Sequence, residues 1–138
     1  MNRLMGFVLI AGALGVLTSC STDRRTEDAI RNAQSWLALV DQGKYESSWD
    51  SAASAFQRAV PREQWVSQVG AVRGPLGAVL SRGVQTSNYT TTLPGAPAGT
   101  YVIIQFATSF ENRRGAVETV TPVQEADGSW KVSGYYVK

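Results

Sequence analysis

The chain has 138 residues, the length of one domain, and its 43% hydrophobic and 17% charged residues are a globular balance. The formal net charge is +2 and the basic residues are scattered, so nothing predicts nucleic-acid binding. The absence of histidine excludes Ser–His and Cys–His nucleophile pairs, and a single cysteine excludes an internal disulfide and a thiolate metal cage. We therefore expect no cofactor.

Residues 1–19 have the pattern of a secretory signal peptide. Arg3 supplies the positive charge, and the uncharged run from Leu4 to Leu17 is shorter than the roughly 20 residues of a membrane-spanning helix. Leu17-Thr-Ser-Cys20 resembles the bacterial lipobox. The resemblance implies cleavage between Ser19 and Cys20, lipid on Cys20 and on the new amino terminus, and the membrane as a partner.

The lipobox also suggests a location in the cell envelope. The residue after the cysteine is Ser21, and an aspartate there would resemble the inner-membrane retention signal. In a Gram-negative cell, the expected location is therefore the outer membrane, facing the periplasm. Residues 20–25 are expected to form a lipidated polar tether and residues 26–138 a single domain.

The first half of this domain predicts helices. Thr26 is a candidate N-cap for a helix that Gly43 ends. A second helix is expected from Tyr45 to Phe56, and Pro61 can start a third that Gly74-Pro75 breaks. Each has an apolar face, made in the first helix by Ala29, Ile30, Ala33, Trp36, Leu37 and Val40.

The second half predicts strands. Residues 79–91 are rich in Val and Thr, and residues 93–99 form a loop. Residues 101–110 are the clearest strand, followed by a turn at 112–115 and a strand at 117–125. An Asp127-Gly128 hairpin signal leads into the last strand, 130–137, in which Trp130, Val132 and Tyr136 should share a face.

Helices followed by a meander of strands predict an α+β fold. The amino-terminal helices should pack on one face of a curved, antiparallel, four-stranded sheet.

With these elements in place, four blocks of sequence resemble the bacterial family called domain of unknown function 4019. The blocks are residues 36–49, 93–101, 118–121 and 127–136. The same layout is similar to the cone-shaped nuclear-transport-factor-two-like superfold, which hosts enzymes, binding proteins and dimerisation modules. The family has no assigned activity, so the resemblance implies a fold and no reaction.

Aromatic residues are numerous and have two interpretations. They could line a cavity between helices and sheet, with Trp49, Trp65, Gln105 and Glu118 as candidate pocket residues. Alternatively they form the core, which we favour for Trp36, Trp49, Trp65, Trp130, Tyr45, Phe106 and Phe110. Gln105 could instead face water on the other side of its strand.

Two carboxylates are candidates for chemistry. Asp50 with Tyr45 could form an acid–tyrosine pair, but their spacing does not place them on one helix face, so Asp50 is expected to be solvated. Glu118 and Arg73 could form an inward polar pair that fixes packing.

Three functions stay open from sequence. The first is a binding module for a small apolar ligand or another envelope protein. The second is an isomerase- or dehydratase-like enzyme with an acid and a tyrosine, which the missing histidine disfavours. The third is a structural homodimer.

Overall fold

The computed structural model describes residues 17–138, with side chains from residue 21 onward. Four α-helices come first: α1 (Leu17–Asp41), α2 (Tyr45–Asp50), α3 (Ser54–Ala59) and α4 (Arg62–Arg73). A 3₁₀ turn, η1 (Gly74–Leu76), leads into the strands β1 (Val79–Thr90), β2 (Tyr101–Phe110), β3 (Arg113–Gln124) and β4 (Trp130–Val137). The predicted α+β order is confirmed.

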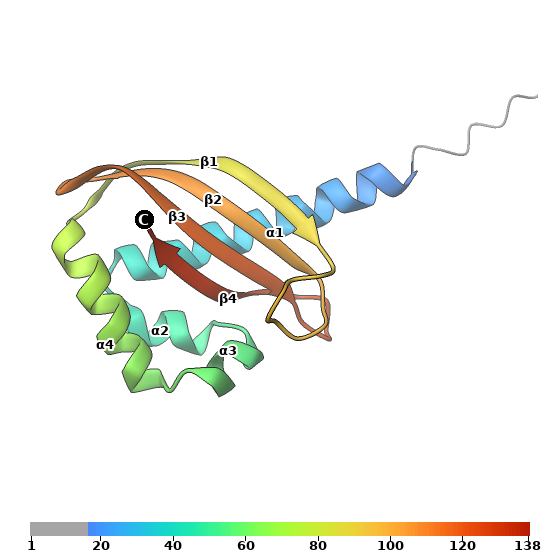
Figure 1. The fold of residues 1–138 in the computed structure, drawn as a ribbon, viewed down its shortest axis with the longest axis horizontal. Helices are drawn as coiled ribbons and strands as arrows, with labels where there is room; N and C mark the ends of the chain where they lie inside the picture. The colour runs from blue at the N-terminus through green and yellow to red at the C-terminus, as the bar shows by residue number, and fades with distance from the viewer. Residues whose placement is uncertain (1–16) are drawn as a thin grey trace, which may run out of the picture.

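The strands form one open antiparallel sheet in the order β1-β2-β3-β4. They bend together over α1, while α2, α3 and α4 lie below the β4 edge (Figure 1). One face of the sheet is therefore covered by helix, as the sequence predicts.

Helix α1 starts earlier than predicted. Thr26 is not its N-cap, because the helix runs without a break from Leu17, and residues 17–25 contain neither glycine nor proline to end it. Residues 21–25, expected as a tether, are therefore helical, and the Arg25 guanidinium donates a hydrogen bond to the Tyr89 hydroxyl at 3.1 Å. Residues 1–16 and the side chains of the lipobox lie outside the described residues.

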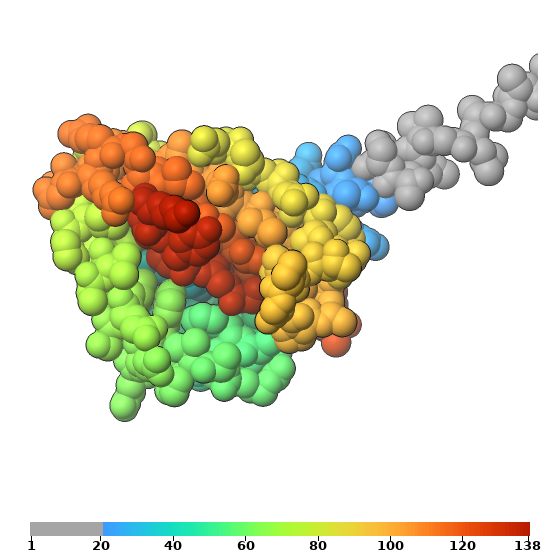
Figure 2. Space-filling view, viewed as in Figure 1, coloured from blue at the N-terminus to red at the C-terminus, as the bar shows by residue number. Residues whose placement is uncertain are grey.

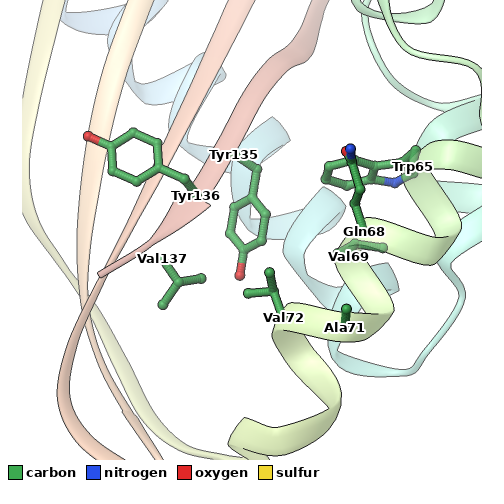
Figure 3. A pocket seen from close by; sticks show the side chains of 8 residues that line it. All are labelled: Trp65, Gln68, Val69, Ala71, Val72, Tyr135, Tyr136 and Val137. Carbon is green, nitrogen blue, oxygen red and sulfur yellow. The ribbon is translucent and has the colours of Figure 1, made fainter.

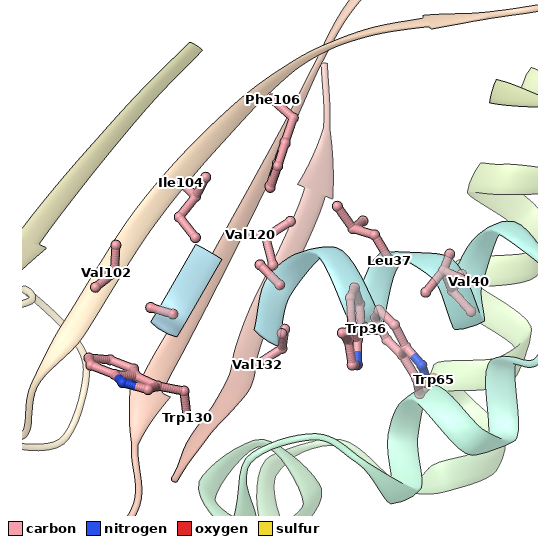
Figure 4. Packing of buried hydrophobic residues seen from close by; sticks show 13 residues of the cluster. Trp36, Leu37, Val40, Trp65, Val102, Ile104, Phe106, Val120, Trp130 and Val132 are labelled. Atoms are coloured by element: carbon pink, nitrogen blue, oxygen red, sulfur yellow. The ribbon is translucent and has the colours of Figure 1, made fainter. Parts of the chain in front are cut away.

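The core lies between α1 and the sheet. Ala29, Ala33, Trp36, Leu37 and Val40 of α1 are buried against Val102, Ile104, Phe106, Val120, Trp130 and Val132 (Figure 4). The predicted inward face of residues 101–110 is confirmed, since Phe106 and Phe110 are fully buried. Trp49 and Tyr45 are partly buried and pack against the same cluster, so the core interpretation of the aromatic residues is confirmed.

Ser48 organises the indole rings. Its carbonyl oxygen accepts a hydrogen bond from Trp36 Nε1 at 2.8 Å, and its hydroxyl accepts one from Trp65 Nε1 at 2.9 Å. Both buried indole N–H groups are thus satisfied, which a tryptophan core requires.

The predicted second helix is two short helices. The chain breaks at residues 51–53, where Ala53 is extended, with φ −60° and ψ 146°. Its N–H donates a hydrogen bond to the Val132 carbonyl on β4 at 2.8 Å. The gain of this bond to a sheet edge explains why the helix does not continue.

Candidate functional site

A groove of about 460 Å³ lies between α4 and the end of β4. Helix α4 contributes one wall and Tyr135, Tyr136 and Val137 the other (Figure 3). Figure 2 shows it as a hollow between the surfaces of α4 and β4. The full lining is Trp65, Gln68, Val69, Ala71, Val72, Tyr135, Tyr136 and Val137.

The groove is apolar and uncovered. Val72, on the α4 wall, is 48% exposed and lies opposite the Tyr135 ring, whereas the Tyr136 ring points away from α4 (Figure 3). None of its lining residues is charged, and Gln68 carries its one polar side chain besides the two tyrosine hydroxyls. Exposed apolar side chains that adjoin in a groove are typical of an interaction site.

A β-bulge sets the β4 wall of this groove. Val120 faces Tyr135 and Pro122 faces Val132, so Ser133 and Gly134 together oppose the single residue Thr121. The extra residue reverses the alternation of side chains along β4. The prediction that Tyr136 shares a face with Trp130 and Val132 was therefore wrong: Tyr135 packs against the core, and Tyr136 is exposed.

A cluster of buried charges adjoins the groove behind Tyr135. Glu118 is fully buried, and its Oε1 accepts hydrogen bonds from Arg82 Nε and from the Thr108 hydroxyl, both at 2.7 Å. The Tyr135 hydroxyl donates to Glu118 Oε2 at 2.5 Å. Arg73 NH1 lies 3.9 Å from the same Oε2, so the predicted contact between Glu118 and Arg73 is present.

Asp41 completes this cluster. It accepts two hydrogen bonds from Arg82, at 2.7 and 2.9 Å, and one from Arg73 NH2 at 2.9 Å. Asp41 is the last residue of α1, where the helix dipole disfavours an anion. Partial burial raises the pKa of Asp41, but the bonds and charges of Arg82 and Arg73 outweigh this, and the net pKa is lowered.

The positive and negative charges of the cluster are equal in number, with two arginines and two carboxylates. The Arg73 guanidinium is buried and stacks on Phe110, with Cζ 4.9 Å from the ring centroid. Burial raises the pKa of the Tyr135 hydroxyl, and the neighbouring Glu118 carboxylate raises it further. Tyr135 is therefore a neutral donor to Glu118 at physiological pH.

The Glu118 carboxylate does not face the groove. Both Glu118 oxygens accept hydrogen bonds, and the residue does not line the groove. Within residues 17–138 there is no group of three acidic or cysteine residues that could hold a metal ion.

The candidate residues have different outcomes. Trp65 lines the groove, whereas Glu118 lies behind it. Trp49 does not line the groove; its Nε1 donates to the Val60 carbonyl at 2.8 Å. The prediction that Gln105 lines the pocket was wrong. Gln105 lies on the other face of β2 from Ile104 and Phe106, where the Thr86 hydroxyl donates a hydrogen bond to its side chain at 3.1 Å.

Asp50 is solvated, as expected, and pairs with Arg62 at 3.0 Å and not with Tyr45. Sequence reasoning missed five residues: Asp41, Ser48, Arg82, Thr108 and Tyr135. Thr108 had a signal, since it shares the alternation of Ile104, Phe106 and Phe110. The others depend on contacts between elements far apart in the chain.

Comparison with known proteins assigns the chain to a family. The chain is an α+β domain with an open antiparallel sheet. Residues 32–135 match the family described as a protein of unknown function (DUF4019), so the chain belongs to that family. No curated protein and no solved structure matched the chain. No helix in the part of the chain that the structure describes is long and apolar enough to cross a membrane.

Proposed function

We propose that this protein is a lipid-anchored envelope protein that acts by binding a partner protein in the groove between α4 and β4. The observation that carries the binding role is the uncovered apolar groove, in which Val72 of α4 is about half exposed opposite Tyr135 and Val137 of β4. The anchor rests on the lipobox at Leu17–Cys20.

The open shape favours a protein over a small ligand. Small-molecule sites enclose most of the ligand surface. Here the walls are an exposed helix face and the edge of a sheet, and the space between α1 and the sheet is filled by side chains. Binding is favoured over catalysis because no acid lines the groove and the Glu118 carboxylate lies behind Tyr135, bonded to its hydroxyl.

The anchor is tested by labelling cells with a palmitate analogue. We expect label on the mature protein and none on Cys20→Ser. Ser19→Ala is the matched control, because it keeps a small residue before the cut and should stay labelled. Labelled Cys20→Ser protein would disprove the anchor. For a Gram-negative host, separation of the two membranes tests the outer-membrane location.

The groove is tested by photo-crosslinking in living cells with a crosslinking amino acid at Val72. Leu80, which is 51% exposed on β1, is the matched control position. We expect a crosslinked partner protein from Val72 only. That partner, once identified and purified, should bind Val72→Asp at least tenfold more weakly than the wild type, and bind Leu80→Asp normally.

Other occupants give other products. A lipid or small molecule crosslinked at Val72 would indicate that the groove binds a ligand and not a partner protein. A second copy of this chain crosslinked there would indicate a homodimer. Equal products from Val72 and Leu80 would show that the groove is not a site. Each of these results overturns the proposal.

A further inference from the structure

The outer edge of β4 has unpaired backbone groups beside the groove. β4 is the last strand of the sheet, so one of its sides has no neighbouring strand. Lys138 and Val117 exchange both backbone hydrogen bonds, at 3.0 and 2.9 Å. Because the direction of these groups alternates along an antiparallel ladder, the N–H and C=O of Val137 and of Tyr135 point away from β3.

The same edge is already used once within the molecule. Ala53, in an extended conformation, donates its N–H to the outward carbonyl of Val132 at 2.8 Å. The edge is thus accessible to a strand-like segment and forms ladder-type bonds. Beyond the bulge, no residue between 17 and 138 bonds to the outward groups of Tyr135 or Val137.

The groove provides a place for the side chains of such a segment. Val69 and Val72 of α4 face Tyr135 and Val137 across it (Figure 3). An extended chain that pairs with Tyr135 and Val137 would run along the groove, between the strand edge and the helix. Natural edge strands avoid unwanted pairing with proline or inward charges. Residues 135–137 carry neither.

We propose that an extended peptide segment of the partner protein adds to β4 at residues 135–137 as a fifth strand, with an apolar side chain against Val69 and Val72. This inference rests on the proposed function and specifies how the partner is recognised. One residue of the segment bonds to both backbone groups of Tyr135, and the residue two positions along bonds to those of Val137. Backbone bonds supply affinity and the groove selects the side chain.

The first test uses a phage-displayed library of random hexapeptides, selected on the full lipidated chain in nanodiscs. We expect peptides with alternating apolar residues that bind the wild type at least tenfold more tightly than Val72→Asp. Synthetic versions with single N-methyl groups should lose about tenfold in affinity when the methyl blocks a residue paired with β4. Methylation of the next residue should leave binding nearly unchanged.

The second test changes the edge itself. The Val137→Pro and Val137→Ala variants both lose the valine side chain, but only the proline variant also loses the outward backbone N–H of residue 137. The proline variant should bind the selected peptide about tenfold more weakly than the alanine variant. Hydrogen exchange on the wild type should show that the amides of Tyr135 and Val137 become protected when the peptide binds.

The outcomes separate this inference from the proposed function. A partner crosslinked at Val72 together with no selected hexapeptide, or with a peptide that leaves the amides of Tyr135 and Val137 unprotected, overturns strand addition and keeps the binding role. If no partner protein is crosslinked at Val72, both the proposed binding role and strand addition are overturned. A second copy bound through the same amides replaces the peptide by a homodimer and also overturns the inference.

Discussion

The charged cluster and the apolar groove meet at Tyr135 and are built in opposite ways. In the cluster, Arg73 and Glu118 are buried and Arg82 and Asp41 lie toward its surface, and each has an opposite charge as a partner. In the groove, the apolar side chain of Val72 remains about half exposed. The difference teaches that a carboxylate bonded to several partners can serve packing, whereas the exposed apolar groove is the surface that we propose as the interaction site.

Arg82→Met should break the cluster most severely. It removes the guanidinium that bonds to both carboxylates and leaves Glu118 buried without its closest cation. We expect a loss of about 3–5 kcal/mol in the free energy of unfolding, measured by urea denaturation. Arg62→Met is the matched control: its pair with Asp50 is exposed, so the urea midpoint should hardly change. Equal losses in the two variants would contradict the special role of burial.

Asp41→Asn tests the same cluster through pH. The pKa of Asp41 is lowered by its arginine bonds, so its stabilisation is complete above the ordinary value of 3.8 and is lost as the pH falls through the lower native value. We expect a deficit of about 2–3 kcal/mol at pH 7. The deficit should shrink as the pH falls below 3.8. A constant deficit over this range would refute the charge-based explanation.

Tyr135→Phe sharpens the boundary between the two regions. It removes the donor to Glu118 and keeps the ring that packs edge-on against Trp36, with ring centroids 5.3 Å apart. Stability should fall by about 1–2 kcal/mol at pH 8, whereas partner binding in the groove should be unchanged. Because the pKa of Tyr135 is raised, this contribution is present below pH 10 and is lost as the pH rises further. In urea unfolding, the difference in the free energy of unfolding between the wild type and Tyr135→Phe should be smaller at pH 11 than at pH 8.

Val72→Asp should have the smallest effect on stability. The side chain is half exposed, so the free energy of unfolding should change by no more than about 0.5 kcal/mol. Partner binding should nevertheless fall at least tenfold, since the new carboxylate would be buried against an apolar segment. A large loss of stability would mean that Val72 belongs to the core and not to an interaction surface.

The sequence predicted much of the fold because local patterns carried it. The alternation in residues 101–110 and the three- and four-residue spacing in residues 29–40 identified buried faces correctly. Pro61 and Gly74-Pro75 marked the limits of α4. The similarity to the cone-shaped superfold stays a prediction.

The start of α1 and the alternation of β4 could not be predicted in this way. Thr26 can cap a helix, but the residues before it also permit helix, so the sequence does not fix where α1 begins. In β4, the bulge is set by pairing with β3, and residues 130–137 alone give no sign of where the alternation reverses.

The sequence by itself determined most of the elements, the apolar faces of α1 and β2 and the absence of histidine, because these depend on residue types and short spacings. The lipobox at Leu17–Cys20 stays a prediction. Only the tertiary structure decided that Glu118 is shared among Arg73, Arg82, Thr108 and Tyr135. It also decided that α4 stands beside an unpaired strand edge and leaves a groove there. Both outcomes follow from strand register and helix packing, which bring together residues far apart in the chain, such as Trp65 and Tyr135 in the groove.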